Sequence, residues 1–388
     1  MENDYQDKLS HLTDDQVNEL MSRYYDGEKN STLIDEYEID ISSSLLVKAF
    51  PMKGYPDILC PYCEIAMVSY RKSKSAYGGE SIFCSQCGHQ KGYSYCRCPN
   101  CLRQREIQEE LRKNEEKVIN ERKRQVILET YSSESRVPIN IAELSIKDKL
   151  YICSLLRTTL DEDLSTLEPV SSSHLKLAPT QEYMNRIISY LRNIDILIFS
   201  PDTPLDSVVV ENDKIISYYP LNARFKVNID LDEYEGLIQY LLNLDDVESI
   251  DDEVKISLWE EIGLNEVLEY LYARMEEYNL PVEYIGDKTI SSIKKALDEY
   301  SVSQVFNFIW RAVKNAAAFY QKGQVSKKHA VNTISGNILR SSEKAKAEGW
   351  EIKGYGRDYN YPQSIISEVF FNNILKIGEL GFTSVIAK

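Results

Sequence analysis

Seven of the eight cysteines in this 388-residue chain lie between positions 60 and 101, and their spacing is that of metal ligands. Cys60 and Cys63 form one Cys-x-x-Cys pair, and Cys84 and Cys87 form a second. Thiolates bind Zn²⁺ tetrahedrally, and two such pairs offer the four donors that one ion needs. We therefore predict a first zinc site from these four residues.

A second set of four donors follows directly: His89, Cys96, Cys98 and Cys101. Two complete sets leave no open coordination position, so both metals are expected to be structural rather than catalytic. The prediction is two Zn²⁺ per chain.

Disulfides or scattered core cysteines are the alternative interpretations of the cluster. The chain starts with neither the basic end nor the apolar stretch of a signal peptide, and no apolar run approaches the roughly 20 residues of a membrane span. A reducing cytoplasm is therefore the expected location, and there clustered cysteines bind metal more often than they cross-link. Cys153 stands apart in an apolar run, where a buried packing role is expected.

Residues 1–55 are expected to form a helix-turn-helix. Thr13 begins a helix as its N-cap, and Ser42-Ser43-Ser44 is expected to cap a third helix that Pro51 ends. The pattern resembles the helix-turn-helix of resolvases and transposases, which implies DNA contact through that third helix. The resemblance points to Ser43, Ser44 and Lys48 as contact residues. Because the stretch is acidic, a three-helix packing module that never touches DNA is the alternative.

Residues 56–105 resemble the zinc ribbons of transposon-encoded and transcription-related proteins, which bind DNA, RNA or protein. A strand is expected at 65–70, followed by a basic turn and a hairpin at Gly78-Gly79. The turn carries Arg71, Lys72 and Lys74, which with nearby aromatic residues could form a nucleic-acid face. The aromatic residues could equally be the small core of the ribbon.

The remaining chain predicts a mostly α, multidomain α+β protein. Residues 106–135 read as a charged helical spacer or a two-stranded pairing surface. Residues 140–228 show helices at 146–160 and 183–193, then strands at 196–199, 207–211 and 214–219, an order that fits a winged helix. Residues 230–388 read as a helical domain, with a short strand at 350–355 and a last helix at 362–377.

The net charge of −16 is unevenly distributed. Residues 60–105 carry 7 basic and 2 acidic side chains (+5), residues 230–300 carry 5 and 20 (−15), and residues 301–388 carry 12 and 6 (+6). Nucleic acid would therefore meet the zinc region or the C-terminal segment. The acidic segment is expected to dock onto the basic C-terminal segment of its own chain or onto a protein partner.

The sequence offers little support for catalysis, since it has no phosphate-binding loop, dinucleotide turn or nucleophile elbow. Two imperfect nuclease-like patterns, Asp202 with residues 211–214 and Glu351-Ile-Lys353, leave an undetected nuclease as one alternative. The prediction is a zinc-dependent nucleic-acid-binding protein, a DNA-binding regulator or targeting subunit of bacterial or mobile-element origin. The other alternative is a zinc-ribbon interaction subunit of a larger assembly, such as a phage-defence system.

Overall fold

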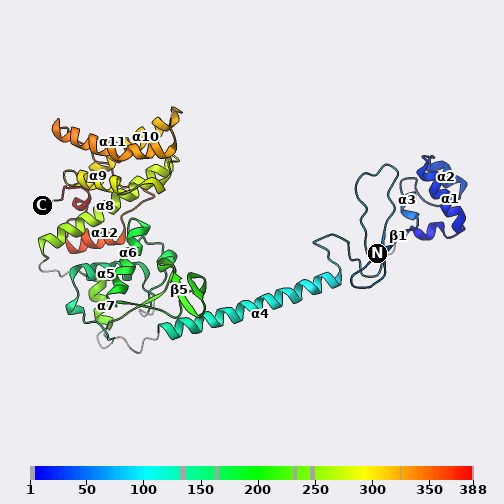
Figure 1. Ribbon diagram of the computed structural model, residues 1–388, viewed down its shortest axis with the longest axis horizontal. Helices are drawn as coiled ribbons and strands as arrows, with labels where there is room; N and C mark the ends of the chain where they lie inside the picture. The colour runs from blue at the N-terminus through cyan, green and yellow to red at the C-terminus, as the bar shows by residue number, and fades with distance from the viewer. Residues whose placement is uncertain are drawn as a thin grey trace. The chain divides into compact units, whose positions relative to one another are not determined.

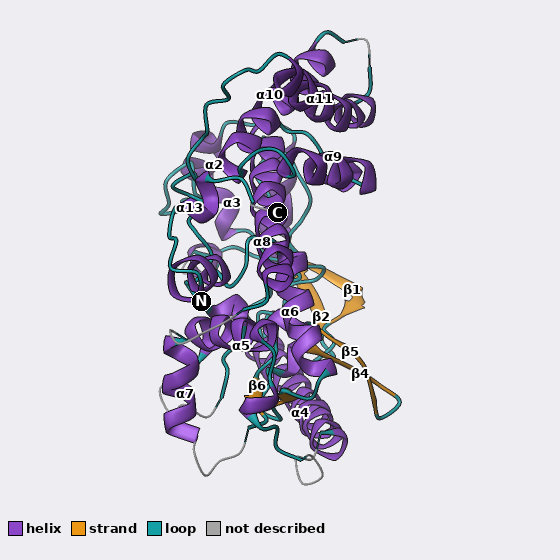
Figure 2. Cartoon of the chain, turned by 90° about the vertical axis from the view of Figure 1, so that its left-hand side faces the viewer, coloured by secondary structure: helices purple, strands orange, loops and turns teal. Residues whose placement is uncertain are grey.

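The computed structural model describes residues 5–131, 137–161, 166–229, 234–244, 250–323 and 325–386 (Figure 1). Helices predominate in this part of the chain, and the strands form three two-stranded antiparallel sheets (Figure 2). The expectation of a mostly α protein with small β elements is confirmed. Two compact units, Met1–Ile119 and Asn120–Lys388, each contain hydrophobic cores of their own. Among the described residues, no helix combines the length and the apolar character needed to cross a bilayer.

The first unit begins with three helices: α1 (Asp14–Tyr25), α2 (Asn30–Glu36) and α3 (Leu46–Ala49). Thr13 caps α1 as predicted: its hydroxyl accepts a hydrogen bond from the Gln16 amide at 3.3 Å, and the Thr13 amide donates to the Gln16 side chain at 2.8 Å. The helices enclose a small core in which Leu20, Leu33 and Leu46 are fully buried.

The third helix is shorter than predicted, because α3 has only four residues. Ser42–Ser44 does not cap it; Leu45 holds the N-cap position, and the Ser42 and Ser44 hydroxyls bond each other at 3.3 Å. Phe50 is extended, as expected before a proline, so the helix ends there. The predicted serine cap is wrong, and one helical turn is too short to act as a conventional recognition helix.

The zinc-ribbon region is built on an antiparallel pair, β1 (Lys53–Leu59) and β2 (Ala66–Ser69). The first Cys-x-x-Cys turn joins them, and β2 confirms the strand predicted at 65–70. β1 was not predicted because Gly54, Pro56 and Asp57 are residues that strands usually avoid. Phe83 extends the hairpin through a bridge to Val68.

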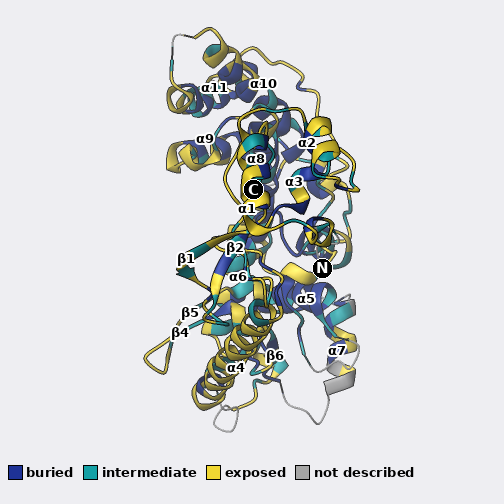
Figure 3. Cartoon of the chain, turned by 90° about the vertical axis from the view of Figure 1, so that its right-hand side faces the viewer, coloured by how far each residue is buried: buried dark blue, intermediate teal, exposed yellow. Residues whose placement is uncertain are grey.

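A long helix, α4 (Pro99–Thr130), begins in the first unit and ends in the second. Most of its side chains are exposed, as the predominance of yellow along it in Figure 3 shows, and only Val126 and Ile127 are buried. Glu109 pairs with Arg112 at 2.8 Å and with Lys113 at 3.7 Å, at the spacings of three and four residues that place side chains on one face of a helix.

The second unit starts with a helical and β region. Its helices are α5 (Ile146–Thr159), α6 (Gln181–Asn193) and α7 (Tyr234–Asn243), and its strands are β3 (Leu197–Phe199), β4 (Val208–Glu211), β5 (Lys214–Tyr218) and β6 (Phe225–Val227). β4 pairs with β5, and β3 pairs with β6, a strand that was not predicted. The helices and strands predicted between 140 and 228 are all present.

The rest of the unit is helical: α8 (Asp252–Glu277), α9 (Asp287–Leu297), α10 (Val302–Gln321), α11 (Lys327–Ala347), α12 (Ile365–Glu368) and α13 (Leu380–Thr383). The acidic α8 and α9 share one core with α10 and α11, which confirms the intramolecular packing expected for the acidic segment. Glu299 pairs with Lys346 across this junction at 2.5 Å. Most of the 230–300 region therefore has a structural role.

Two details of the C-terminal region differ from the prediction. Residues 350–355 form no strand; the backbone carbonyls of Ile352 and Lys353 instead accept hydrogen bonds from the Gln304 and Asn307 side chains of α10, at 3.2 and 3.0 Å. The predicted helix at 362–377 is broken into the short α12, a π-helical segment (Val369–Ile374) and a turn. At residues 350–355, the side chains on α10 supply the hydrogen bonds that a neighbouring strand would supply in a sheet.

Candidate metal centres

The first centre brings together Cys60, Cys63, Cys84 and Cys87, whose sulfur atoms all lie within 4.8 Å of one another. Cys60 and Cys84 are buried, and the sulfur atoms of Cys60 and Cys87 are 3.7 Å apart. Four sulfur donors at this separation match the donor set of a structural zinc site. The grouping predicted from the spacing is confirmed.

The two Cys-x-x-Cys turns of the first centre have the same backbone geometry. The carbonyl of the first cysteine accepts from the residue after the second: Glu64 N to Cys60 O at 3.0 Å, and Gly88 N to Cys84 O at 2.9 Å. That residue has a positive φ in both turns, +55° for Glu64 and +73° for Gly88. The ligands therefore come from two equivalent knuckles. A positive φ favours glycine, and only the second knuckle has glycine at the position after its second cysteine.

Backbone amides are directed at the sulfur atoms. The Cys87 amide donates to the Cys84 sulfur at 3.5 Å. Burial raises the pKa of the Cys84 thiol, but the amides of Cys87 and Gln86 lower it, and the pKa is about 7. Donation to sulfur stabilises the thiolate, which is the form that binds metal.

The second centre joins His89 to Cys96, Cys98 and Cys101, again with donor atoms within 4.8 Å of one another. His89 turns its Nδ1 atom toward the cysteines, 3.2 Å from the Cys101 sulfur and 3.9 Å from the Cys98 sulfur. The sequence identified the histidine but not which ring nitrogen faces the site. The Gln90 amide donates to the Cys96 sulfur at 3.4 Å. Burial raises the pKa of the Cys96 thiol, but hydrogen bonds from the amides of Cys98 and Gln90 lower it, and the pKa is about 6.

The second centre also defines the start of α4. The Cys98 sulfur accepts from the Cys101 amide at 3.4 Å, and the Cys98 carbonyl accepts from the Leu102 amide at 3.0 Å. Cys98 therefore occupies the position of an N-cap, and Pro99 follows at the first helical position, where proline is favoured. Arg105, one turn into the helix, donates to the backbone carbonyls of Cys96 and Cys101.

Tyr62 connects the two centres. It lies between the ligands Cys60 and Cys63, yet its hydroxyl is 3.3 Å from the Cys101 sulfur and donates to Gln104 Oε1 at 2.9 Å. Its ring packs edge-on against His89, with centroids 5.1 Å apart. Such outer contacts orient metal ligands. The position of Tyr62 inside a knuckle is the only sequence signal for this role, because its contacts with Cys101 and Gln104 depend on the tertiary structure.

Both donor sets suit Zn²⁺, since cysteine-rich tetrahedral sets are characteristic of structural zinc. Among the described residues, these two clusters are the only groups of three or more His, Cys, Asp or Glu close enough to hold a metal ion. Asp202, Glu211 and Glu351, which carried the nuclease alternative, are not brought together in such a group. That alternative receives no support from the described part of the chain.

The basic residues predicted to contact nucleic acid lie at a junction inside the first unit. Arg71 donates to the Pro51 carbonyl at 2.9 Å, and Lys74 donates to the Glu28 carbonyl at 2.6 Å. Lys72 bonds the carbonyls of the hairpin glycines, and Tyr25 donates to the Lys72 carbonyl at 2.8 Å. These bonds tie the ribbon to the helical module.

The predicted helix-turn-helix contacts lie elsewhere. Ser43, Ser44 and Lys48 are exposed around the single turn of α3. The Ser43 carbonyl accepts from Asn30 at 2.7 Å, and Lys48 lies 6.0 Å from the centre of the Tyr5 ring.

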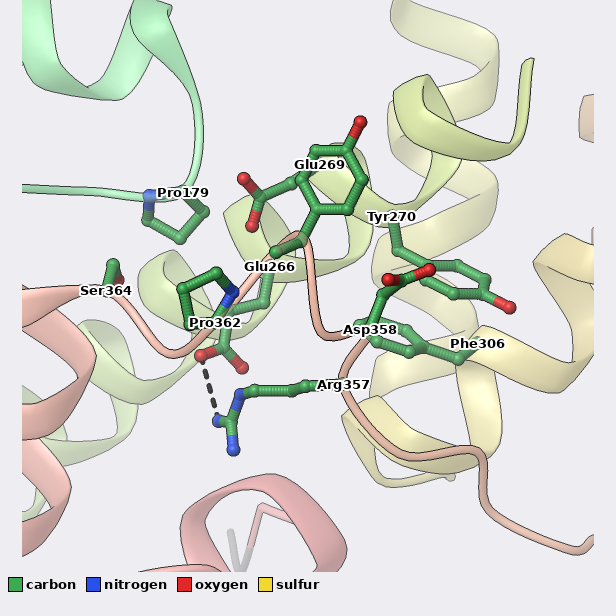
Figure 4. Close-up of a pocket in the computed structure, with 10 residues that line it drawn as sticks. Pro179, Glu266, Glu269, Tyr270, Phe306, Arg357, Asp358, Pro362 and Ser364 are labelled. Atoms are coloured by element: carbon green, nitrogen blue, oxygen red, sulfur yellow. Dashed lines mark hydrogen bonds and ion pairs between the residues drawn. The ribbon is translucent and has the colours of Figure 1, made fainter. Parts of the chain in front are cut away.

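A polar cavity in the second unit is lined by ion pairs and hydrogen bonds and not by metal-ligand residues (Figure 4). Arg357 donates to Glu266 at 3.0 Å, Ser367 donates to the same carboxylate oxygen at 2.7 Å, and Arg274 pairs with Asp358 at 2.8 Å. These bonds hold the extended segment around 357–364 against α8. The cavity volume of about 20 Å³ fits a single water molecule, so the network is structural.

The clusters establish two candidate metal sites of the kind that zinc-binding proteins use. Comparisons with protein-family models, with curated proteins and with solved structures found no match for the chain.

Proposed function

We propose that this protein binds nucleic acid, DNA in the first place, through its zinc-organised first unit, and acts as a non-enzymatic regulator or targeting subunit. One observation carries the proposal: the metal centres hold a basic stretch in which no acidic residue occurs between Glu80 and Glu106. Lys91, Arg97 and Arg103 are exposed in this stretch and make no ion pair within the described residues. Unpaired cations on a rigid support are what phosphate contacts need.

Metal binding lowers this charge without removing it. Seven thiolates and two Zn²⁺ contribute −3, so the net charge of residues 60–105 falls from +5 to +2. The acidic 230–300 segment, at −15, repels nucleic acid. Residues 60–105 are thus a better location for contact than the 230–300 segment, and their low net charge implies modest, salt-sensitive affinity.

The test is fluorescence anisotropy of the full-length, zinc-loaded protein with labelled DNA and RNA at several salt concentrations. We expect binding that weakens as salt rises and that is lost when a chelator removes the metal. Replacing Lys91, Arg97 and Arg103 with alanine should flatten the salt dependence by about one counterion per lost contact. Absence of binding to any nucleic acid at low salt would reject the proposal.

The basic turn at residues 71–74 gives a matched comparison for this charge-removal variant. Alanine at Arg71, Lys72 and Lys74 removes the same formal charge, but these side chains bond backbone carbonyls inside the unit. If they also contact phosphate, this variant should lose affinity and salt dependence too, with zinc content unchanged. If it loses only thermal stability, its residues are structural and the contact surface lies nearer the second centre.

A protein-interaction subunit is the second candidate, favoured by exposed apolar side chains that share one face of the first-unit part of α4: Ile107, Leu111 and Val118. Such a stripe suits pairing with another helix. Light scattering of the purified protein distinguishes the two cases. A stable dimer that Leu111→Glu dissociates, together with absent nucleic-acid binding, would favour the interaction role, with Glu110→Lys as the control.

A further inference from the structure

The loop between His89 and Cys96 carries two exposed tyrosines at the rim of an open groove. Tyr93 and Tyr95 are 55% and 72% exposed, and their rings meet edge-on with centroids 6.3 Å apart. The groove, about 770 Å³, is lined by Tyr93 and Tyr95, by Arg97 and Arg105, and by residues of both metal centres, among them Cys87, Cys96 and Cys98. Two exposed aromatic rings this close together offer a ligand a combined aromatic surface.

Metal-ligand residues and hydrogen bonds fix the residues that line the groove. Cys96 and Cys98 flank Arg97 and are both buried ligands, and the Cys96 amide donates to the Tyr93 carbonyl at 3.1 Å. Arg105 is fixed by its bonds to the carbonyls of Cys96 and Cys101. The tyrosine side chains contribute nothing to these bonds. The rings take no part in holding the backbone, so they are available to contact a ligand.

The charge of the groove selects the ligand. Arg97 is exposed and makes no ion pair within the described residues, Lys91 lies two residues before Tyr93, and the stretch from Ser81 to Arg105 has no carboxylate side chain. A ligand that offers flat rings and negative charge matches this surface. Unpaired bases provide the rings for stacking, and their phosphates meet the cations, whereas a paired duplex keeps its base faces covered.

We infer that the groove formed by Tyr93, Tyr95 and Arg97 binds single-stranded nucleic acid by stacking unpaired bases on the tyrosine rings. The inference rests on the proposed function and specifies its ligand. The contact surface would then lie beside the second metal centre and not at the basic turn of residues 71–74. Binding should be tolerant of sequence, because every base has a face that stacks.

The experiment compares the full-length, zinc-loaded wild type with Y93A/Y95A, using a labelled oligonucleotide in single-stranded form and the same sequence as a duplex. We expect the wild type to prefer the single strand. Loss of two stacking contacts should weaken single-strand binding by at least about 30-fold while duplex binding changes little. Y93F/Y95F keeps the rings and should retain the affinity.

Tyr77→Ala provides the matched control, since Tyr77 is the fully exposed tyrosine of the neighbouring hairpin. It should leave affinity unchanged, and all variants should keep two zinc ions per chain. If the wild type binds nucleic acid but Y93A/Y95A binds as well as it does, the inference is overturned and the proposed function stands. If the wild type binds neither form, both are overturned, and the tyrosines are better explained as a protein contact.

Discussion

The two metal centres differ in what they hold together. The first takes its ligands from two knuckles separated by twenty residues of chain, and it fixes the β1–β2 hairpin against the Phe83 segment. The second takes all its ligands from positions 89–101 and ends on the first turn of α4. A metal that closes a long loop determines tertiary structure, whereas one that closes a short loop determines local structure. Loss of each should therefore have a distinct consequence.

Loss of the first centre should have the largest effect. We expect Cys84→Ala to reduce the zinc content below two per chain and to unfold the ribbon, because structural zinc contributes about 10–16 kcal/mol that is coupled to folding. Metal analysis together with limited proteolysis measures both. Cys153→Ala is the control, since Cys153 is buried outside the clusters and should leave two zinc ions bound. A Cys84→Ala protein with two zinc ions and an intact first unit would contradict the assignment.

Loss of the second centre should be local. Cys98→Ala removes one ligand and the sulfur cap of α4, so we expect one zinc per chain and faster amide exchange in the first two turns of the helix. Exchange in β2 should stay slow. Asn100→Ala, a neighbour in the same turn that is not a ligand, should change neither quantity. Unchanged exchange across 99–106 in Cys98→Ala would show that the helix starts without the metal.

Removal of the contact between the Tyr62 hydroxyl and the Cys101 sulfur should have an intermediate effect. Tyr62→Phe removes the hydroxyl that lies 3.3 Å from the Cys101 sulfur, and outer contacts of this kind typically change metal affinity by about 10- to 100-fold. We expect one of the two zinc ions to transfer to a chelator at least about tenfold faster. Tyr70→Phe, in the ribbon but distant in sequence from any ligand, is the comparison. Equal acceleration of both ions would show that Tyr62 supports the whole fold.

The smallest effect should come from the two equivalent turns. Gly88→Ala places a side chain at φ +73° and should cost about 1 kcal/mol in the free energy of unfolding. Glu64→Gly relieves the same constraint at φ +55° and should be neutral or stabilising by a similar amount. Chemical denaturation of the zinc-loaded protein measures both. Destabilisation by Glu64→Gly would show that the carboxylate contributes more than its backbone conformation costs.

The metal ligands could be predicted because residue type and spacing contain nearly all the information a knuckle needs. Cysteine is rare, and the Cys-x-x-Cys turn is local, so the grouping into two sets follows from sequence order. The ring nitrogen that His89 presents and the reach of Tyr62 to Cys101 depend on tertiary contacts, which local patterns do not contain. Zinc itself stays a prediction, as does nucleic-acid binding.

The fold also divides into elements that local sequence patterns predict and elements that depend on tertiary contacts. The helix α6, with strong apolar periodicity, lies where expected. The single turn of α3 could not be distinguished from a longer helix, because buried Leu46 and Phe50 fit either. The segment at 350–355 has an alternating pattern, but α10 satisfies its carbonyls in place of a strand. Predictions were wrong where a distant partner decided the backbone conformation.

The bonds between the ribbon and the helical module have a consequence for how the protein can vary. All three acceptors, on Glu28, Pro51 and Lys72, are main-chain carbonyls. A carbonyl persists whatever side chain its residue carries, so substitutions at Glu28 or Pro51 that keep the backbone path leave the acceptor intact. The donors Arg71, Lys74 and Tyr25 have no such freedom. Pro51 should therefore tolerate substitution more readily than the donors Arg71, Lys74 and Tyr25. Glu28 and Lys72 should vary less than Pro51, because the Glu28 side chain also pairs with Arg23 at 2.8 Å and the Lys72 side chain bonds the hairpin glycines.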